Sequence, residues 1–216
     1  TWSTATALGT AVQMVSGCGT KTAGLVIGGD TADTANPIST VQAWNGSAWS
    51  TSTGGTLNIV RNQHASGGIN TSAWAQGGTT GSMGQVTSSS FWNDTSWTSG
   101  GVTSVGRRNH GGAGSTDDCW ITGGYDGSNS LASTEQYNGT SWSAGGNLSV
   151  AVNSIMGGGG DTYNAIITGG YDGSNNSNRS NIYNGTAWSL GGTLSNAHRY
   201  GITSGTPDDA IAGLGY

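Results

Sequence analysis

A tryptophan followed by serine or threonine recurs along this 216-residue chain at spacings of 45 to 48 residues. The tryptophans are Trp2, Trp49, Trp97, Trp142 and Trp188. Five residues before each of the last four stands another aromatic residue, at Trp44, Trp92, Tyr137 and Tyr183. Asn-Gly, or Asn-Asp in one copy, lies between the two aromatics and supplies the positive φ of a type I′ turn. Each segment therefore predicts two short antiparallel strands joined by a tight hairpin.

A second pair of strands can be aligned backwards from a recurring Gly-Gly. LVIGG, AWAQGG, CWITGG, AIITGG and the variant AIAGLG end at Gly29, Gly78, Gly124, Gly170 and Gly215. A Gly- or Ser-rich turn precedes each, and before it comes an inner strand such as LNIVRNQHASGG or LSVAVNSIMGGGG. Four strands in about 40–50 residues are typical of a propeller blade. The units are 2–48, 49–96, 97–141, 142–187 and a partial unit, 188–216.

Composition favours an ordered all-β chain. It contains 41 Gly, only 8% charged residues and no stretch with amphipathic helical spacing. Regularly placed Trp and Tyr argue against disorder. We expect one domain over residues 1–216, a small β-propeller of about five four-stranded blades. The fifth unit lacks its third strand, and Thr1-Trp2-Ser3 would supply its outermost strand and close the ring. A longer parent chain or a shortened fifth blade would also fit.

The Gly-Gly after the second strand, the aromatic in the third and the Trp in the fourth resemble a Kelch-type propeller repeat over nearly the whole chain. Segments such as YNGTSW at 137–142 are also similar to degenerate repeats in marine bacteriophage virion structural proteins. The resemblance implies a non-enzymatic structural or receptor-contacting protein of the virion surface, such as a capsid decoration, tail or fibre component. An extracellular carbohydrate-binding propeller, with exposed aromatic rings stacked on sugars, is the alternative.

Charge and hydropathy restrict the partners. The formal net charge of −5 argues against nucleic acid and anionic membrane surfaces. No apolar run approaches the roughly 20 residues that cross a bilayer, and no signal segment stands at the start. Because the sequence begins with Thr1, an export signal could have been lost. We expect a virion or extracellular location, other virion proteins or a host cell-surface glycan or receptor as partner, and an oligomeric assembly as an open alternative.

No catalytic site or cofactor is expected, because the sequence has no Ser-His-Asp arrangement, phosphate-binding helix start or carboxylate pair at fixed spacing. Both cysteines are predicted to be free thiols in slots for small residues. Cys119 aligns with Ala73, Ala165 and Ala210, and Cys18 aligns with Gly67, Ala113, Gly159 and Ser204.

The histidines and arginines have structural interpretations. His64, His110 and His198 share no metal-ligand spacing such as HxxxH, so we expect structural or channel-lining roles and no metal. The inner strands are predicted to carry Arg61, Arg107, Arg108 and Arg199. An anion site in the central channel is one hypothesis, and we favour guanidinium groups that satisfy carbonyls of the neighbouring blade. Solvated turns rather than calcium sites are expected at Asp117-Asp118, Asp161 and Asp208-Asp209.

One face of the propeller is the predicted binding surface. The second-to-third connections emerge on the same side of a blade as the fourth-to-first connections, and they differ in every blade, whereas the hairpins are nearly identical. Repeat proteins usually place their binding surface where a repeated scaffold varies. We predict that this loop face contacts the partner through Tyr125, Asp126, Asn129, Tyr171, Asp172 and Asn175.

Overall fold

The computed structural model of the chain describes residues 5–31, 36–52, 54–81, 84–155, 157–213 and 215–216. These residues form 18 β-strands and no helix, and thus none long and apolar enough to cross a membrane. The strands build four four-stranded antiparallel sheets and one two-stranded sheet, with the strands of each sheet adjacent in chain order.

The bounds of the strands follow the repeat. The first sheet contains β1 (Ser16–Thr20), β2 (Ala23–Ile27), β3 (Val41–Trp44) and β4 (Trp49–Thr51). The second contains β5 (Ala65–Ile69), β6 (Ser72–Gln76), β7 (Ser88–Trp92) and β8 (Trp97–Val102). The third contains β9 (Gly111–Gly114), β10 (Cys119–Thr122), β11 (Thr134–Tyr137) and β12 (Trp142–Ala144). The fourth contains β13 (Gly159–Gly160), β14 (Ala165–Thr168), β15 (Ser177–Tyr183) and β16 (Trp188–His198), and the fifth contains β17 (Ile202–Thr206) and β18 (Asp209–Gly213).

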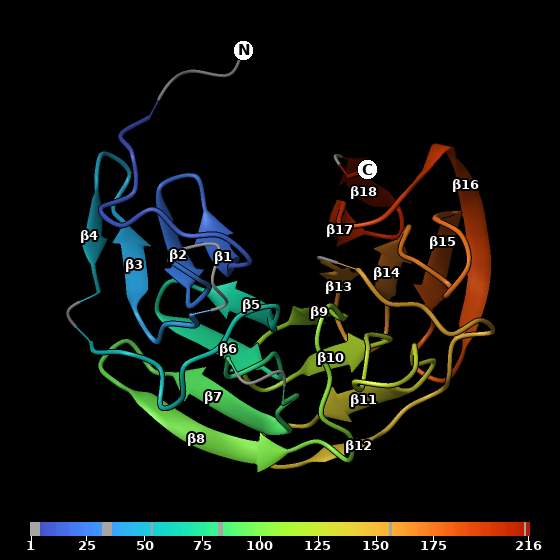
Figure 1. Cartoon of the computed structure of the whole chain (residues 1–216), viewed down its shortest axis with the longest axis horizontal. Coiled ribbons are helices and arrows are strands. Elements are labelled where there is room, and N and C mark those ends of the chain that lie inside the picture. Colours follow the sequence, from blue (N-terminus) through green and yellow to red (C-terminus); the bar gives the residue numbers. More distant parts are fainter. Residues whose placement is uncertain (1–4, 32–35, 53, 82–83, 156, 214) are drawn as a thin grey trace.

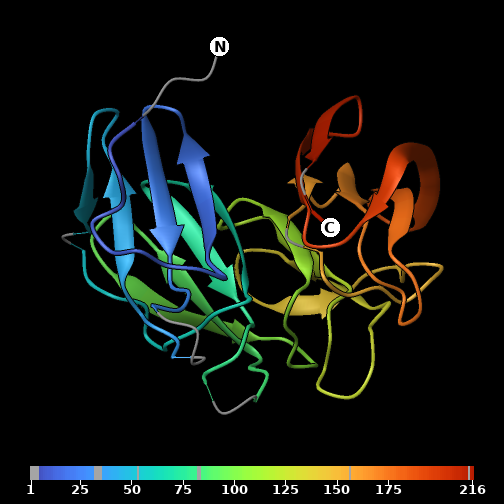
Figure 2. The ribbon, with the colours of Figure 1, turned by 45° about the horizontal axis from the view of Figure 1, so that its top comes forward.

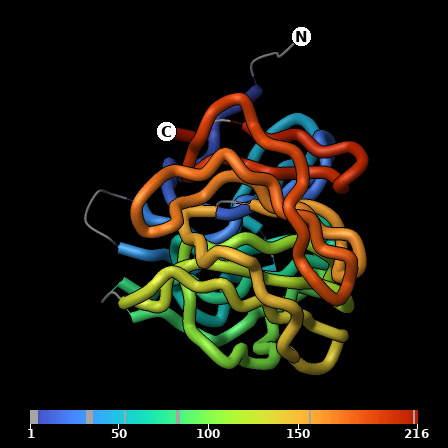
Figure 3. The backbone as a smooth tube through the Cα atoms, turned by 90° about the vertical axis from the view of Figure 1, so that its right-hand side faces the viewer, coloured from blue at the N-terminus to red at the C-terminus, as the bar shows by residue number. Residues whose placement is uncertain are grey.

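The five sheets stand side by side in an arc, with the first strand of each sheet toward the centre (Figure 1). The arc is open between the fifth sheet and the first, and the described N-terminal segment and the C-terminal residues lie on opposite sides of this opening (Figure 1). Figure 3 views the same arrangement from the side of the fourth sheet. The fold is therefore all-β and propeller-like. Thr1, Trp2 and Ser3, which we expected to complete the last blade, lie outside the described residues.

The recurring Gly-Gly marks the closest approach between sheets. In the four complete sheets the first glycine has φ of 58 to 69° and the second has φ of 87 to 97°. The N–H of the second glycine donates to the segment that leads into the next sheet, as Gly29 does to the carbonyl of Arg61 at 2.9 Å. A Cβ at the first glycine would lie 2.6 to 2.8 Å from the same carbonyl oxygen. Glycine is needed here for both conformation and space.

A second left-handed position precedes every inner strand, and none of its five residues is glycine. They are Met14, Gln63, Asn109, Ser154 and Tyr200, with φ between 51 and 57°. Their backbones link neighbouring sheets: Gln63 N–H donates to Met14 O at 3.0 Å, Asn109 N–H to Gln63 O at 2.9 Å, and Tyr200 N–H to Ser154 O at 2.8 Å. A left-handed residue interrupts an extended strand. The inner strands therefore begin later than predicted, as β5 does at Ala65 and β13 at Gly159.

Two tryptophans fill the space between inner strands. Trp74 of β6 and Trp120 of β10 are fully buried. A Cβ at Gly112 would lie 3.0 Å from the Trp74 ring, and one at Gly158 would lie 2.5 Å from the Trp120 ring. The glycine-rich inner strands thus leave room for large side chains from the second strands, and the core of the molecule lies between the sheets.

The predicted hairpins are present and their aromatic residues pack on each other, but the turns differ from the predicted type. Ring centroids lie 5.0 to 5.7 Å apart in the pairs Trp44–Trp49, Trp92–Trp97, Tyr137–Trp142 and Tyr183–Trp188. A type I′ turn needs positive φ at both central residues, whereas Gly139 has φ of 86° and Asn138 does not share this conformation. Instead, Asn138 Oδ1 accepts the N–H groups of Thr140 and Ser141 at 3.0 Å. The asparagine side chain therefore caps the turn.

Candidate functional site

The six predicted partner-binding residues lie in two equivalent loops, one between β10 and β11 and one between β14 and β15. Asp126 and Asp172 each accept two N–H groups of their own loop at 2.7 to 2.9 Å. These backbone hydrogen bonds lower the pKa of both carboxyl groups. Asn129 and Asn175 end the two turns and are exposed. The aspartates thus fix the shape of the loops. Figure 2 shows the sheets in a tilted view, in which loops extend from both ends of the strands.

A tyrosine begins each of these loops and is partly exposed. The backbone of Tyr125 pairs with that of Arg108 through hydrogen bonds of 2.9 and 3.1 Å. The Arg108 guanidinium lies over the Tyr125 ring, 5.3 Å from its centroid. A guanidinium over an aromatic face is attracted by the ring quadrupole, so Arg108 orders this tyrosine.

Three tyrosines surround Arg199 where the fourth and fifth sheets meet. Its guanidinium lies 5.2 Å from the ring centroid of Tyr171, 5.8 Å from that of Tyr200 and 5.0 Å from that of Tyr216. The Tyr216 backbone pairs with that of Arg199, and the Tyr171 backbone pairs with that of Asn153. The loop face therefore carries two cation–aromatic groups on a framework of paired backbones.

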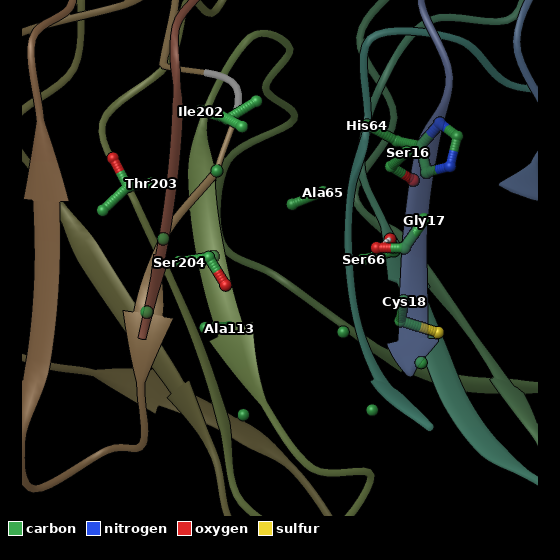
Figure 4. A pocket seen from close by; sticks show the side chains of 18 of the residues that line it. Ser16, Gly17, Cys18, His64, Ala65, Ser66, Ala113, Ile202, Thr203 and Ser204 are labelled. Atoms are coloured by element: carbon green, nitrogen blue, oxygen red, sulfur yellow. Dashed lines mark hydrogen bonds between the residues drawn. The ribbon is translucent and has the colours of Figure 1, made fainter. Parts of the chain in front are cut away.

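A cavity of about 800 Å³ lies between the five inner strands. Figure 4 places Thr203 and Ser204 of β17 on one side, and Ser16, Gly17 and Cys18 of β1 on the other. Its described lining consists mainly of glycine backbone, small residues and hydroxyl groups, and contains no Lys, Arg, Asp or Glu. The hypothesis of an arginine-based anion site in the channel is therefore not supported.

His64 and His110 line this cavity as buried, uncharged groups. A Cβ at Gly28 would lie 3.1 Å from His64, and one at Gly77 would lie 2.8 Å from His110. Burial lowers the pKa of both imidazoles well below the usual value, and the positive charges of Arg61 and Arg107 lower it further. The His64 imidazole has no hydrogen-bond partner within the described part of the chain, where no group of three or more His, Cys, Asp or Glu could hold a metal.

Arg61 and Arg107 satisfy carbonyls, but those of their own sheets rather than of the neighbouring blade. Arg61 donates to the carbonyls of Gly77 and Ser88 at 3.1 Å, and Arg107 to those of Gly123 and Ser133 at 2.9 Å. All four predicted inner-strand arginines lie before the inner strands, because the left-handed residue delays the start of each strand. Arg107 also forms an ion pair with Glu135 at 2.9 Å, with both side chains buried.

The acidic turns and the thiols lie where the sequence suggests. Asp161 Oδ1 accepts the N–H groups of Tyr163 and Asn164 at 2.8 and 2.9 Å, and Asp118 accepts a hydrogen bond from the Thr162 hydroxyl.

Cys18 and Cys119 are free thiols, and their strands belong to different sheets. Strand register confirms the predicted equivalences, since Cys18 opposes Leu25 as Gly67 opposes Trp74. Burial raises the pKa of Cys18 to about 12.

Sequence reasoning missed the aromatic surroundings of Arg108 and Arg199. Both residues come one position after an already aligned residue, Arg107 and His198 respectively, and both pair with the residue that follows a Gly-Gly or its equivalent. The repeat alignment could have been extended by one residue after Arg107 and His198. Pairing that position with the position after the Gly-Gly would have placed a basic residue opposite a tyrosine.

Comparison with known proteins informs the fold. No protein-family model and no curated protein sequence matches the chain. Among solved structures, the fold is similar to that of YjhT, with a TM-score of 0.71 and 13% sequence identity over 89% of this chain and 74% of that chain. At this identity the likeness is one of fold alone.

Proposed function

We propose that the protein is a non-enzymatic binding module that contacts its partner through the loop face. The carrying observation is the placement of Tyr125 and Tyr171, which are partly exposed and lie against Arg108 and Arg199. Their loops are held by backbone pairing and by aspartate-capped turns. An ordered surface loses less conformational entropy when a partner binds.

The partner class follows from the repeat resemblance. We propose a virion surface component, such as a decoration, tail or fibre protein, that contacts another virion protein or a host receptor. The alternative is a carbohydrate-binding propeller. It is supported by the presence of a partly exposed tyrosine and an exposed asparagine in each of the two loops, because sugar rings stack on aromatic faces and their hydroxyls bond to amides.

The test combines localisation with a paired substitution. Antibody labelling of purified virions should detect the protein on the particle, and absence from particles would contradict the virion assignment. A variant with Tyr125→Ala and Tyr171→Ala should lose at least tenfold in attachment to the particle or receptor while keeping its circular dichroism spectrum. The matched control is Thr140→Ala with Thr186→Ala in the hairpin turns, both exposed on the other side of the sheets. If the control weakens attachment and the tyrosine variant does not, the wrong face has been assigned.

A glycan array with the isolated protein separates the two classes. Selective binding to one sugar family that is lost in the tyrosine variant would favour the carbohydrate-binding alternative. A blank array together with particle localisation would favour contact with a protein.

We also propose that the five sheets are blades of one ring, with the N-terminal residues as the outermost strand of the last blade. Thr6 Oγ1 donates to the carbonyl of Ser47 in the first-sheet hairpin at 3.3 Å. The residue equivalent to Thr6 after Trp142 is Gly146, and a Cβ there would meet the carbonyl of Thr186 in the next hairpin. The segment after Trp2 thus lies against the hairpin of the first sheet, just as the segment after Trp142 lies against the hairpin of the fourth sheet, which follows it in the chain. This correspondence supports the proposed placement.

A further inference from the structure

We propose that the central cavity binds an uncharged, hydroxyl-rich ligand of monosaccharide size, which the side chains of His64 and Ser16 orient. This site is separate from the loop face, and the inference does not depend on which partner that face binds. The cavity volume of about 800 Å³ lies within the range of about 300–1,000 Å³ that is usual for small-molecule sites. The chemistry of its wall specifies the class of ligand.

The wall of the cavity consists largely of strand backbone. In the four complete sheets the inner strand lies at the edge and pairs within its sheet only with the second strand. Runs of consecutive residues from the inner strands line the cavity, among them residues 65–69 and 157–160. The unpaired edge of a strand presents N–H and C=O groups. A ligand with several hydroxyl groups can use both kinds of group, because a hydroxyl donates and accepts hydrogen bonds.

The charge of the wall favours a neutral ligand. The described lining contains no acidic or basic side chain that could neutralise a charged one, and Arg61 and Arg107 lie outside it and donate to carbonyls of their own sheets. Burial, together with the positive charge of Arg61, lowers the pKa of His64 well below its usual value, so its imidazole is neutral at neutral pH. A charged ligand would enter without a counter-charge, and the burial of an unpaired charge is costly.

His64 and Ser16 supply side-chain hydrogen-bonding groups that the protein itself does not use. The His64 side chain is 5% exposed. Both of its ring nitrogens and Ser16 Oγ are buried without a hydrogen-bond partner among the described residues. Buried polar atoms of this kind are rare in folded proteins, and a bound molecule accounts for them. Both residues line the cavity, and the ligand meets these atoms after a rotation of each side chain about its χ angles.

The two side chains lie close together between the first and second sheets. The N–H of Gln63 donates to the carbonyl of Met14 at 3.0 Å and joins the segments that lead into β1 and β5. His64 and Ser16 follow within two residues of this hydrogen bond, and Figure 4 shows both of them at the wall of the cavity. The first and second sheets each contain four strands, so complete sheets bound this part of the cavity.

Other repeats supply matched substitutions for both residues. Ile155 directly follows the left-handed residue of its repeat, as His64 does. Ala65 opposes the residue before the Gly-Gly, as Ser16 does. His64→Ile and Ser16→Ala therefore remove hydrogen-bonding groups and introduce side chains that the fold already accepts at these positions.

The test is a titration of the full chain with D-galactose, D-glucose and N-acetyl-D-glucosamine, followed by calorimetry and by the ring resonances of the three histidines. We expect at least one of these sugars to shift the His64 resonances in a saturable manner at millimolar concentration. The uronic acid with the same ring, such as galacturonic acid for galactose, should bind at least tenfold more weakly, because its carboxylate finds no counter-charge.

The variants test the two orienting residues. His64→Ile should weaken sugar binding at least tenfold and Ser16→Ala several-fold, with unchanged circular dichroism spectra. The control is Thr140→Ala with Thr186→Ala in the exposed hairpin turns, which should bind the sugar as the wild type does. If His64→Ile does not fold, Ser16→Ala and the comparison with the uronic acid still decide the question.

Several outcomes would overturn the proposal. If none of the three sugars shifts the His64 resonances, water alone fills the cavity. Equal affinity for the sugar and its uronic acid, or wild-type affinity in both His64→Ile and Ser16→Ala, would also contradict it. Sugar binding that is lost in the variant with Tyr125→Ala and Tyr171→Ala but kept in His64→Ile would place the sugar on the loop face. That result would reject the cavity site and leave the carbohydrate-binding alternative for the loop face standing.

Discussion

Arg61 and Arg107 occupy the same position in consecutive repeats, yet only Arg107 has a carboxylate beside it. Glu135 pairs with Arg107 and also accepts the N–H and hydroxyl of Ser104, whereas the equivalent Ser90 offers Arg61 a hydroxyl at 3.2 Å. Burial lowers the pKa of the Arg61 guanidinium to about 10. One fold position thus tolerates a buried cation with or without a counter-charge, provided that carbonyl oxygens surround it.

Glu135→Ala should lower the free energy of unfolding by about 3 kcal/mol, since it leaves a buried guanidinium without its counter-charge and removes two further hydrogen bonds. Ser90→Ala, the control at the equivalent position, should cost no more than about 1.5 kcal/mol because it removes a single hydroxyl. Urea denaturation at neutral pH measures both values. Equal losses would mean that the ion pair adds nothing beyond an ordinary hydrogen bond.

The two buried histidines make stability sensitive to acid. The folded protein holds His64 and His110 neutral, with pKa values well below those of the unfolded chain. The unfolded state therefore binds more protons below about pH 6.5, and the free energy of unfolding should fall by up to about 1.4 kcal/mol per pH unit for each histidine. The loss should continue until the pH reaches the lowered pKa of the folded state.

Denaturation curves between pH 7.5 and 4.5 measure this slope. His110→Ile is the matched variant, because Ile155 fills the corresponding slot of the next repeat and packs against Gly123. The variant should show about half the acid dependence while remaining folded at pH 7.5. A wild-type stability that does not change over this range would show that the imidazoles are charged or solvated in the folded state.

At the scale of strands and turns, the sequence repeat predicts those features that are determined by residues close to one another in the chain. The position of the hairpins and the end of each second strand at the Gly-Gly follow from Asn, Gly and the aromatics, and the four complete sheets confirm them. The left-handed residue before each inner strand was not predictable, because Met14, Gln63 and Tyr200 share no chemical property that favours this conformation. Hydrogen bonds between sheets stabilise it, and these join residues about 45 positions apart.

The turn geometry predicts how one hairpin responds to substitution. Gly139 has φ of 86°, where a β-branched side chain clashes with its own backbone, so Gly139→Val should cost about 1–2 kcal/mol of stability. Asp94 occupies the same turn position with φ of 74°. Asp94→Asn, the control, should change stability by less than about 0.5 kcal/mol, because both residues tolerate this conformation. Thermal unfolding of the two variants compares them. A harmless Gly139→Val would mean that the turn adopts another conformation in solution.

At the scale of the whole molecule, each sheet is stabilised by its neighbours along the arc. The second and third sheets have a sheet on each side and share buried clusters with them, as Trp74 and Ile121 do. Among the described residues, the fifth sheet has two strands, an edge of β18 without a partner strand and an exposed Ile211. In a chain of units that contact mainly their neighbours, stability is approximately a sum of unit and interface terms.

Local opening should therefore be easiest in the fifth sheet. Native-state amide exchange at low urea should give β18 an opening free energy several kcal/mol below that of β10, its equivalent in the third sheet, because β10 lies between two strands and all four of its residues are buried. The internal comparison is β14, which has the same register position in the four-stranded sheet next to the fifth and should fall between the two. If β18 instead exchanges only with global unfolding, then in solution the opening of the arc is closed by the chain itself, and the fifth sheet is a complete blade before any partner binds.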